Sequence, residues 1–358
     1  MIKNVSFHDF RNLDGLSLDL APITMLTGSN GVGKSSVLEG LYCLLGGGYI
    51  DVSELTRYSR SYLNLGNGFD YKKFWEECPS FGKTSCTVGI TTVDFSISWQ
   101  YNKSSLRDLE SELVAKAHIP IDDLTEFARF HWVIEGLDGG MYERAGKSKF
   151  TSAQILTPDG GFHLLFFMGQ SHVAGCDYLN FFDLRKQFLE LPLETEKKLT
   201  TALKILNQRI TGVRLKNIKG GLSIILDDEN EISLEALGYG AISCANLFST
   251  LIDLERKYTR HNLPYVLLID EIGAGVHYSV MLDLWKYIKD FSEQHPGIQF
   301  IFTSHSDDCI RAFCRAFEES DNAQVVSLHR QLNDKTIPTY FAKDEFEEII
   351  SGSWEVRG

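Results

Sequence analysis

The sequence predicts an α/β fold with a mixed central sheet and an inserted α+β subdomain. Near the N-terminus, the apolar run 23–27 precedes a glycine-rich stretch, which is followed by apolar residues at helical spacing. In the last third, strand patterns alternate with helical patterns of roughly 10 to 18 residues, which is typical of parallel strands joined by crossovers. Between these parts the pattern loosens. We therefore divide the chain into residues 1–48 and 231–358, two parts of one core, and residues 49–230, an insertion.

The expected elements follow from the period of the apolar residues, about 2 in strands and 3.6 in helices. Strands are expected at 2–6, 16–20, 23–27, within 86–101, and at 130–134, 162–167, 213–218, 222–227, 265–269, 299–302 and 323–329. Helices are expected from the glycine-rich stretch to about Leu45, where Gly46–Gly48 end the pattern, and at 106–117, 178–191, 194–210, 241–258, 279–291 and 307–318.

Residues 28–35 read Gly-Ser-Asn-Gly-Val-Gly-Lys-Ser, a complete G-x-x-x-x-G-K-S phosphate-binding loop between a strand and a helix. Glycines let successive backbone N–H groups surround a phosphate, and the helix N-terminus adds positive potential. Lys34 is expected to reach the β- and γ-phosphates, and the Ser35 hydroxyl to bind Mg²⁺. A glycine-rich turn that merely precedes a helix is the alternative, but every specified position is filled. We expect a P-loop NTPase that binds ATP and Mg²⁺ through Asn30, Gly31, Gly33, Lys34, Ser35 and Ser36.

Two later strands end in polar residues that suit the same chemistry. The apolar run 265–269 ends in Asp270 and Glu271, and the run 299–302 leads into Thr-Ser-His305. Ligands collect beyond the carboxyl ends of parallel strands. We expect Asp270 to hold Mg²⁺, Glu271 to polarise the attacking water, and His305 to contact the γ-phosphate or that water. Without other motifs, the acidic pair would be interpreted as the end of a strand and His305 as a surface histidine. Because the same chain also contains a complete phosphate loop, we expect Lys34, Glu271 and His305 to be catalytic residues.

Bulk properties exclude several classes of protein. The 358 residues are 43% hydrophobic and 23% charged, ordinary values for a soluble protein. No signal peptide is seen, and no apolar run reaches the roughly 18 to 20 residues that span a bilayer. Seven cysteines without a C-x-x-C pair indicate reduced thiols and neither disulfides nor a metal site. We expect a cytoplasmic protein without a membrane partner. The net charge of −13 does not favour nucleic acid as a partner, although residues 57–73 and 144–149 are locally basic.

The order of these motifs resembles the ATP-binding-cassette-type ATPases, in particular the RecF/SMC-like branch and its overcoming-lysogenisation-defect (OLD)-like members. Residues 7–12, Phe-His-Asp-Phe-Arg-Asn, resemble the F-R-N turn of that branch, which implies nucleotide contacts for Arg11 and Asn12. The segment from Asp270 to Ser279 resembles its loop after the Asp-Glu pair, and residues 352–358 resemble the tail of its stand-alone members. The resemblance is strong at both ends and thin between about 49 and 233.

Such families hydrolyse ATP between two subunits, with a signature segment of one capping the nucleotide on the other. Residues 233–241 match that segment, which implies nucleotide contacts for Gly238 and Gly240. This segment departs from the transporter sequence LSGGQ because Tyr239 stands between the glycines. Residues 273–275, Gly-Ala-Gly, depart from the family's acidic residue and Asn. The glutamine of the family's Q-loop is left open among Gln100, Gln154 and Gln170.

The resemblance implies an ATP-dependent homodimer or higher homo-oligomer that acts as a switch. The first hypothesis is the ATPase component of a prokaryotic anti-phage system that controls a separate effector, a nuclease or toxin. OLD-like relatives often carry a TOPRIM nuclease after the ATPase, and with the last residue at Gly358 we expect none here. The alternative is a RecF-like repair ATPase that clamps DNA. A transporter subunit is disfavoured by the altered signature and the long insertion, and a metabolic kinase would not need Gly238, Gly240 or His305.

Overall fold

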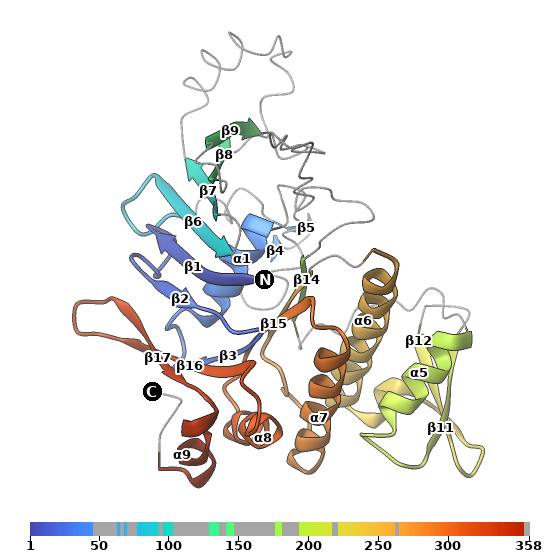
Figure 1. The fold of residues 1–358 in the computed structure, drawn as a ribbon. Helices are drawn as coiled ribbons and strands as arrows, with labels where there is room; N and C mark the ends of the chain where they lie inside the picture. The colour runs from blue at the N-terminus through green and yellow to red at the C-terminus, as the bar shows by residue number, and fades with distance from the viewer. Residues whose placement is uncertain are drawn as a thin grey trace, which may run out of the picture. The chain divides into compact units, whose positions relative to one another are not determined.

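The computed structural model describes residues 1–45, 63–64, 68–69, 77–92, 96–102, 129–135, 141–146, 176–180, 193–216, 221–261 and 265–353. The chain divides into two compact units, and Figure 1 shows the course of the ribbon. The first unit contains Met1–Leu20, Asn30–Cys176 and Leu328–Pro338, and the second contains Ala21–Ser29, Asp177–Ser327 and Thr339–Gly358. Both units are therefore assembled from distant parts of the sequence, and the phosphate loop passes from the second unit into the first.

The first unit contains an antiparallel sheet of six strands in the order β2-β1-β6-β7-β8-β9. Alternate residues of β6, Cys86, Val88 and Ile90, are buried, which is the period-2 pattern of a strand with one face on a core. The last four strands in this order follow one another along the chain, and each is antiparallel to the next. The strands are β1 (Ile2–His8), β2 (Ser17–Asp19), β6 (Ser85–Thr92), β7 (Ser96–Asn102), β8 (Arg129–Glu135) and β9 (Met141–Gly146), and β4 (Leu63–Asn64) pairs with β5 (Gly68–Phe69) separately.

Helix α1 (Lys34–Leu45) packs in the first unit close to β1. A Cβ added at Gly40 would lie 2.6 Å from the ring of Phe7 and 3.2 Å from that of Phe10. The absence of a side chain at Gly40 thus lets the helix approach the strand and the turn that follows it. The turn after β1 and the helix after the phosphate loop are held together by this contact.

The second unit is built on a sheet with the order β10-β14-β15-β3-β16-β17. Strands β14, β15 and β3 are parallel, and β16 and β17 are joined by a short turn at 331–335, which makes them antiparallel. The sheet is therefore mixed. Its strands are β3 (Ile23–Gly28), β10 (Cys176–Asn180), β14 (Tyr265–Asp270), β15 (Ile298–Thr303), β16 (Ala323–Arg330) and β17 (Thr336–Phe341). The end of β16 and the start of β17 lie in the segment Leu328–Pro338, which belongs to the first unit.

One large hydrophobic core fills the second unit. Alternate residues of the parallel strands, among them Leu267, Phe300 and Met25, join buried residues of the helices in that core, mainly of three long ones. The indole of Trp285 lies at its centre, edge-on to the rings of Phe302 and Phe313, each 5.0 Å away between centroids. The helices are α6 (Tyr239–His261), α7 (Tyr278–Gln294) and α8 (Asp307–Phe317), and η4 (Lys343–Glu345) and α9 (Phe346–Ser351) end the described chain.

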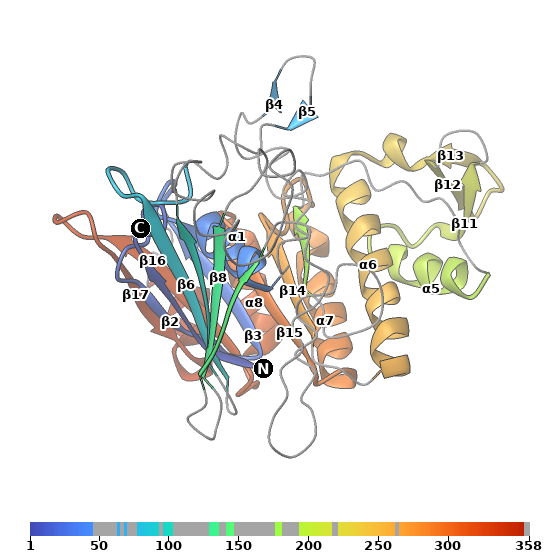
Figure 2. The ribbon, with the colours of Figure 1, turned by 90° about the horizontal axis from the view of Figure 1, so that it is seen from above.

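A small subassembly of the second unit lies along α6. Helix α5 (Leu193–Leu203) packs beside α6, and a three-stranded antiparallel sheet follows it (Figures 1 and 2). That sheet contains β11 (Ile210–Lys216), β12 (Gly221–Leu226) and β13 (Glu231–Ser233), and η3 (Leu234–Leu237) connects it to α6. The signature-like segment is thus the junction between this small sheet and a long helix.

Most expected elements of the core are present within one to three residues of the predicted bounds. Two predictions are wrong. Residues 178–180 belong to strand β10 and not to a helix, because they lie beside β14 in the sheet. The helix expected over 194–210 ends at Leu203, because Ile210 already pairs with Leu226 in β11. The expected helix 106–117 and strand 162–167 lie outside the described residues.

The expected boundaries of the insertion stay a prediction. None of the helices that the structure describes is both long and apolar enough to cross a membrane.

Candidate functional site

The phosphate loop has the backbone that its glycines predict. Gly28, Gly31 and Gly33 have φ values of 130°, 77° and 116°, a region that residues with a Cβ rarely adopt. At Gly33 space is restricted as well, because a Cβ would lie 2.3 Å from Leu13 Cδ2. Helix α1 starts at Lys34, whose side chain is buried, and the Val37 N–H donates to the Gly33 carbonyl at 2.9 Å.

Two side chains from outside the loop hold it in place within the first unit. The Asn12 amide Nδ2 donates to the carbonyl of Gly31 at 2.7 Å. The Thr336 hydroxyl donates to the carbonyl of Val32 at 3.1 Å. Both bonds use carbonyl groups of the loop, and neither of them uses an N–H group. Asn12 is therefore placed to orient the loop, and its predicted contact with nucleotide stays a prediction.

Arg11 lies in the same turn with a φ of 49°, and its side chain is directed into the unit. Its guanidinium Nη1 forms a buried ion pair with Glu39 Oε2 of α1. The Cζ atom of the same guanidinium lies 5.6 Å from the centre of the Phe10 ring, within the range of a cation–π contact. Arg11 thus ties the turn after β1 to α1 through a charge pair. Its predicted role as a nucleotide ligand stays a prediction.

The start of the phosphate loop lies at the edge of the second unit's sheet where β14, β15 and β3 all end. Thr303 pairs in register with Leu26, and the Ser304 N–H donates to the Leu26 carbonyl at 3.3 Å. Strand β3 ends at Gly28 and β14 at Asp270. Because parallel strands present their carboxyl ends to one edge, the first loop residues and the acidic pair share this edge, as expected for a ligand site in an α/β sheet.

The segment after β15 holds the end of β14 through successive hydrogen bonds. The Thr303 hydroxyl donates to Asp270 Oδ1 at 2.5 Å and accepts from the Glu271 N–H at 2.8 Å. The Thr303 carbonyl accepts from the Ile272 N–H at 2.9 Å. The Ser304 hydroxyl donates to the Ile272 carbonyl at 3.0 Å. Three consecutive residues of the acidic loop are therefore fixed by the neighbouring strand.

Glu271 and His305 form a direct pair. His305 Nε2 lies 2.6 Å from Glu271 Oε1, and the two side chains are 38% and 21% exposed. Glu271 has a φ of 57°, the left-handed region that is uncommon for a residue with a side chain. Such a conformation persists when the surroundings fix it, and it is common at functional sites. The pair is thus partly open to solvent, where a water molecule and a phosphate can reach it.

The thiols beneath this loop have no exposed surface. Cys309 Sγ donates to the Ile272 carbonyl at 3.4 Å, and the Trp285 indole donates to the Cys309 carbonyl at 3.0 Å. Burial raises the pKa of the Cys309 thiol and that of the Cys314 thiol to about 12 each. Both thiols are protonated at neutral pH and act as small buried side chains.

The signature-like segment contacts the loop that follows Glu271. Gly238 has a φ of 90° and separates η3 from α6, which begins at Tyr239, two residues before the predicted start. A Cβ on Gly240 would lie 2.2 Å from the carbonyl oxygen of Gly275. Only glycine allows the two backbones to approach so closely. Tyr239 beside them is 38% exposed.

The loop after Glu271 leads directly into α7. His277 caps this helix, since its Nδ1 accepts from the Ser279 N–H at 3.3 Å. Its ring centroid lies 4.4 Å from that of Tyr278, which is 68% exposed. His277 therefore has a structural role as the N-cap of α7.

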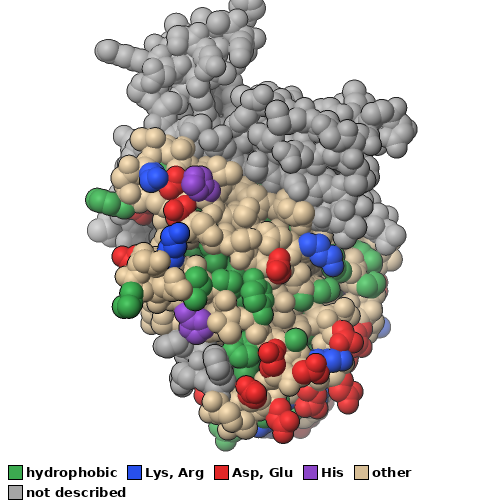
Figure 3. All heavy atoms as spheres, turned by 60° about the vertical axis from the view of Figure 1, so that its left-hand side comes forward, with side chains coloured by type: hydrophobic (Ala, Val, Ile, Leu, Met, Phe, Trp, Pro, Cys, Tyr) green, Lys and Arg blue, Asp and Glu red, His purple; other side chains and the backbone are tan. Residues whose placement is uncertain are grey.

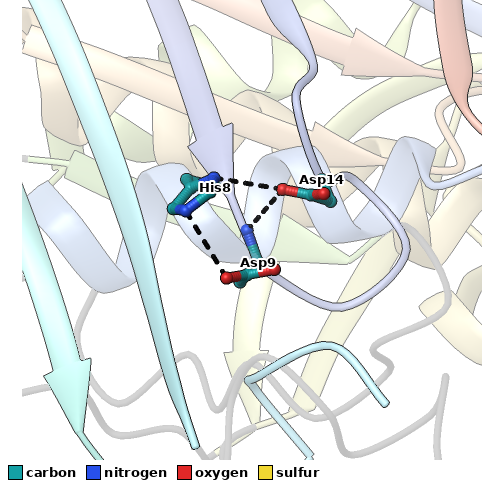
Figure 4. A group of neighbouring side chains, drawn as sticks. All are labelled: His8, Asp9 and Asp14. Carbon is teal, nitrogen blue, oxygen red and sulfur yellow. Dashed lines mark hydrogen bonds and ion pairs between the residues drawn. The ribbon is translucent and has the colours of Figure 1, made fainter. Parts of the chain in front are cut away.

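An acidic group with a histidine lies in the turn after β1. Figure 4 shows His8 between Asp9 and Asp14, with His8 Nε2 3.4 Å from Asp9 Oδ2 and His8 Nδ1 3.2 Å from Asp14 Oδ1. The Asp9 N–H donates to Asp14 at 2.9 Å, which lowers the pKa of the Asp14 carboxyl, and Lys83 Nζ lies 3.1 Å from Asp9. These contacts stabilise the turn that carries Arg11 and Asn12.

The predicted residues fall into two sets. One set lies in the second unit and comprises Asp270, Glu271, His305, Gly238 and Gly240; the other lies in the first unit and comprises Arg11, Asn12, Asn30, Gly31, Gly33, Lys34, Ser35 and Ser36. Sequence reasoning assigned no role to Thr303, Ser304 or Thr336. A hydroxyl residue at the end of a strand, two positions before His305, was the available signal for Thr303. Of the three glutamines, Gln100 lies on β7, and the other two lie outside the described residues.

Residues 176–310 match the family model described as an AAA ATPase domain. The matched residues run from β10 into α8 and contain Asp270, Glu271 and His305. This chain carries an ATPase domain. The expected enzyme class, an ATPase, and the expected P-loop ATPase fold with a mixed central sheet are confirmed. None of the curated proteins compared with this chain matches it.

Solved structures show similarity over almost the whole chain at low identity. The SMC head domain from Thermotoga maritima is 12% identical, with a TM-score of 0.49, over 95% of this chain and 98% of that one. The recombination mediator RecF with bound ATP is 13% identical, with a TM-score of 0.41, over 95% of this chain and 99% of that one. A second RecF structure, titled RecF-ATPrS, is 12% identical, with the same TM-score, over 96% and 98%. No residue's role is taken from these structures.

Proposed function

We propose that this ATPase is a switch in which two copies close on Mg-ATP and separate after hydrolysis. The observation that carries the proposal is the contact between the signature-like segment and the loop after Glu271. Gly240 and Gly275 meet backbone to backbone, beside the exposed side chain of Tyr239. The segment that would cap a nucleotide on a second copy thus lies next to the acidic loop of its own copy. A change at Glu271 can then alter the surface offered to that second copy.

The metal and phosphate ligands are proposed from the chemistry of their donors. Mg²⁺ prefers oxygen ligands, and Asp270 offers a buried carboxylate and Ser35 a half-buried hydroxyl. Lys34 at the start of α1 supplies a positive charge for the β- and γ-phosphates. When bound, Mg²⁺ neutralises charge that develops on the phosphates.

Glu271 and His305 are proposed to act on the attacking water and the γ-phosphate. The Glu271 carboxylate can accept a proton or a hydrogen bond from water, and His305 lies within hydrogen-bonding distance of it. His305 would orient the carboxylate in the absence of substrate and turn toward phosphate when it binds.

The test is Glu271→Gln in the full chain. Amide for carboxylate keeps the shape but removes the proton acceptor, so we expect turnover to fall by about a hundredfold or more while ATP binding stays. The bound dimer then accumulates, and light scattering with ATP and Mg²⁺ gives about twice the mass of the protein alone. Unchanged hydrolysis in Glu271→Gln would exclude Glu271 as the catalytic carboxylate.

For the biological role, we propose control of a separate effector in anti-phage defence. The resemblance to OLD-like ATPases supports this role, and the second-unit surface around Tyr239 changes with the nucleotide in the proposed cycle. A neighbouring coding sequence for a nuclease or toxin, and loss of protection against phage in Lys34→Ala, are the expected observations. Protection that survives Lys34→Ala would contradict an ATP-dependent role.

DNA clamping is the alternative, and charge does not favour it. On the face in Figure 3, acidic side chains gather toward the bottom, whereas the described Lys and Arg side chains are scattered without a continuous basic patch. The net charge of the sequence is −13. A salt-dependent shift of labelled duplex DNA with ATP present would favour the alternative, and no shift at low salt would remove it.

A further inference from the structure

We propose that Thr303 is a positioning residue for ATP hydrolysis. Its hydroxyl sets the orientation of both acidic residues, through the carboxylate of Asp270 and through the backbone N–H of Glu271. This inference rests on the proposed function, because it assumes that Asp270 holds Mg²⁺ and that Glu271 activates water.

The Thr303 hydroxyl acts both as a donor and as an acceptor, toward two neighbouring residues. The side chain is completely buried at the end of β15. The Glu271 N–H donates to its oxygen at 2.8 Å, and this oxygen donates its single proton to Asp270 Oδ1 at 2.5 Å. A hydroxyl has one hydrogen, so donation to Asp270 fixes the rotor, and the lone pairs then face Glu271.

The two bonds act on groups with different chemical tasks. The bond to Asp270 Oδ1 fixes the orientation of the whole carboxylate and so the direction of its other oxygen. Mg²⁺ requires such a fixed direction, because it demands near-octahedral geometry. The bond to Glu271 holds a residue whose φ of 57° is disfavoured, and the Glu271 side chain departs from that backbone toward His305. Thr303 therefore couples metal ligation to the placement of the catalytic carboxylate.

A purely structural role for the hydroxyl is the competing explanation, and Thr24 provides the matched comparison. Thr24 is also completely buried in the same sheet, on the neighbouring strand β3. Its hydroxyl accepts from the Ala21 N–H at 3.1 Å, donates to the Ala21 carbonyl at 3.1 Å, and accepts from Gln324 at 3.3 Å. Among the residues that the structure describes, it contacts no carboxylate. Thr24→Val thus removes a buried strand hydroxyl without touching the acidic pair.

The experiment compares Thr303→Val, Thr303→Ser and Thr24→Val in the purified full chain. Steady-state ATP hydrolysis is measured against Mg²⁺ concentration at saturating ATP, and ATP binding is measured in EDTA. In Thr303→Val we expect the Mg²⁺ midpoint to rise and kcat to fall, each by about tenfold, the usual effect of losing a hydrogen bond to a charged group. ATP affinity in EDTA should stay within about twofold, because the phosphate loop is intact.

The controls separate positioning from stability. Thr303→Ser keeps the hydroxyl and is expected to restore the Mg²⁺ midpoint to within about threefold of the wild type. Thr24→Val is expected to keep the wild-type midpoint, since loss of folded protein lowers the rate but does not shift a midpoint. Thr303→Cys replaces the hydroxyl by a weaker donor and is used if Thr303→Val is not recovered folded. A raised midpoint in Thr303→Cys supports the proposal, and an unchanged one overturns it.

The outcome that overturns the proposal is a Thr303→Val midpoint and kcat equal to those of Thr24→Val. Equal damage in Thr303→Val and Thr303→Ser also overturns it, because the hydroxyl would then not be the group that matters. Lys34→Ala in the same assay distinguishes failure of the proposed function from failure of this inference. Wild-type turnover in Lys34→Ala removes the proposed function together with this inference, whereas an inactive Lys34→Ala with an unaffected Thr303→Val removes the inference alone.

Discussion

At the scale of single residues, Arg11 and Glu39 form an ion pair from which water is excluded. Their side chains are 4% and 0% exposed. A buried charge that loses its partner is costly, because neither water nor an opposite charge compensates it. The turn that carries Asn12 toward the phosphate loop therefore depends on an ion pair whose arginine the resemblance had implied to be a nucleotide ligand.

Arg11→Met tests this dependence. We expect the free energy of unfolding to fall by about 3 to 5 kcal/mol, because the Glu39 carboxylate stays buried and loses the charge of Arg11, and the double variant Arg11→Met, Glu39→Leu to recover much of that loss. Urea unfolding measures both. The control in the same unit is Lys83→Met, whose pair with Asp9 is 3.1 Å long but has a lysine 54% exposed, so a loss of less than about 1 kcal/mol is expected. Equal losses in Arg11→Met and Lys83→Met would contradict the buried pair.

Residue roles can be proposed from the sequence where a motif carries them, and not where the partner lies far along the chain. Lys34, Asp270 and Glu271 stand in motifs whose chemistry can be read from adjacent residues. The bond from Thr303 to Asp270 spans 33 residues and that from Thr336 to Val32 spans 304. No local pattern records such pairings, because they depend on which strands become neighbours.

At the scale of elements, the N-terminus of α6 and the loop at 273–276 meet without side chains between them. Gly240→Ala places a Cβ 2.2 Å from the Gly275 carbonyl oxygen, so one of the two backbones must move. We expect ATP binding by one copy to persist and ATP-dependent association to weaken by about tenfold or more, as for other overpacked sites. Light scattering against protein concentration measures this.

Gly221→Ala is the matched control for that change. Gly221 lies at the start of β12 in the same unit, and a Cβ there would have no atom within 4 Å. Association is expected to stay at the wild-type level. Equal association of Gly240→Ala and Gly221→Ala would show that the close approach has no part in dimer formation.

Elements were predicted best where apolar residues follow one period over many residues, as in α7 and α8. Strand β17 was missed because Pro338 interrupts it, and proline removes a donor from a strand. Strand β10 was taken for a helix because its few residues carry no decisive period, and its place beside β14 settles its conformation. Short elements are thus determined by their neighbours in space.

At the scale of the whole molecule, the phosphate loop is shared by two units. Gly28 and Ser29 belong to the second unit, and the residues from Asn30 onward belong to the first. Any ligand of this loop therefore acts on the stability of both parts of the chain.

Lys34→Ala makes this measurable. A ligand that binds only the folded state stabilises it by about 2.7 kcal/mol at a hundred times its Kd. We expect ATP with Mg²⁺ to raise the Tm of the wild type by several degrees and to leave that of Lys34→Ala unchanged, because the variant lacks the phosphate-binding charge. Thermal unfolding of both proteins with and without ATP measures the two shifts in Tm. An equal rise in both proteins would show that nucleotide stabilises the chain without Lys34.

The contact between Gly240 and Gly275 also has a mechanical consequence. Side chains adapt to small displacements by changing rotamer, but two backbones in direct contact cannot adapt in this way. Residue 275 is four positions from Glu271, and Tyr239 precedes residue 240. A shift of the acidic loop on loss of the γ-phosphate would therefore displace the start of α6. Because this 23-residue helix moves as a rigid body, a displacement of less than 1 Å at its start would also move its far end.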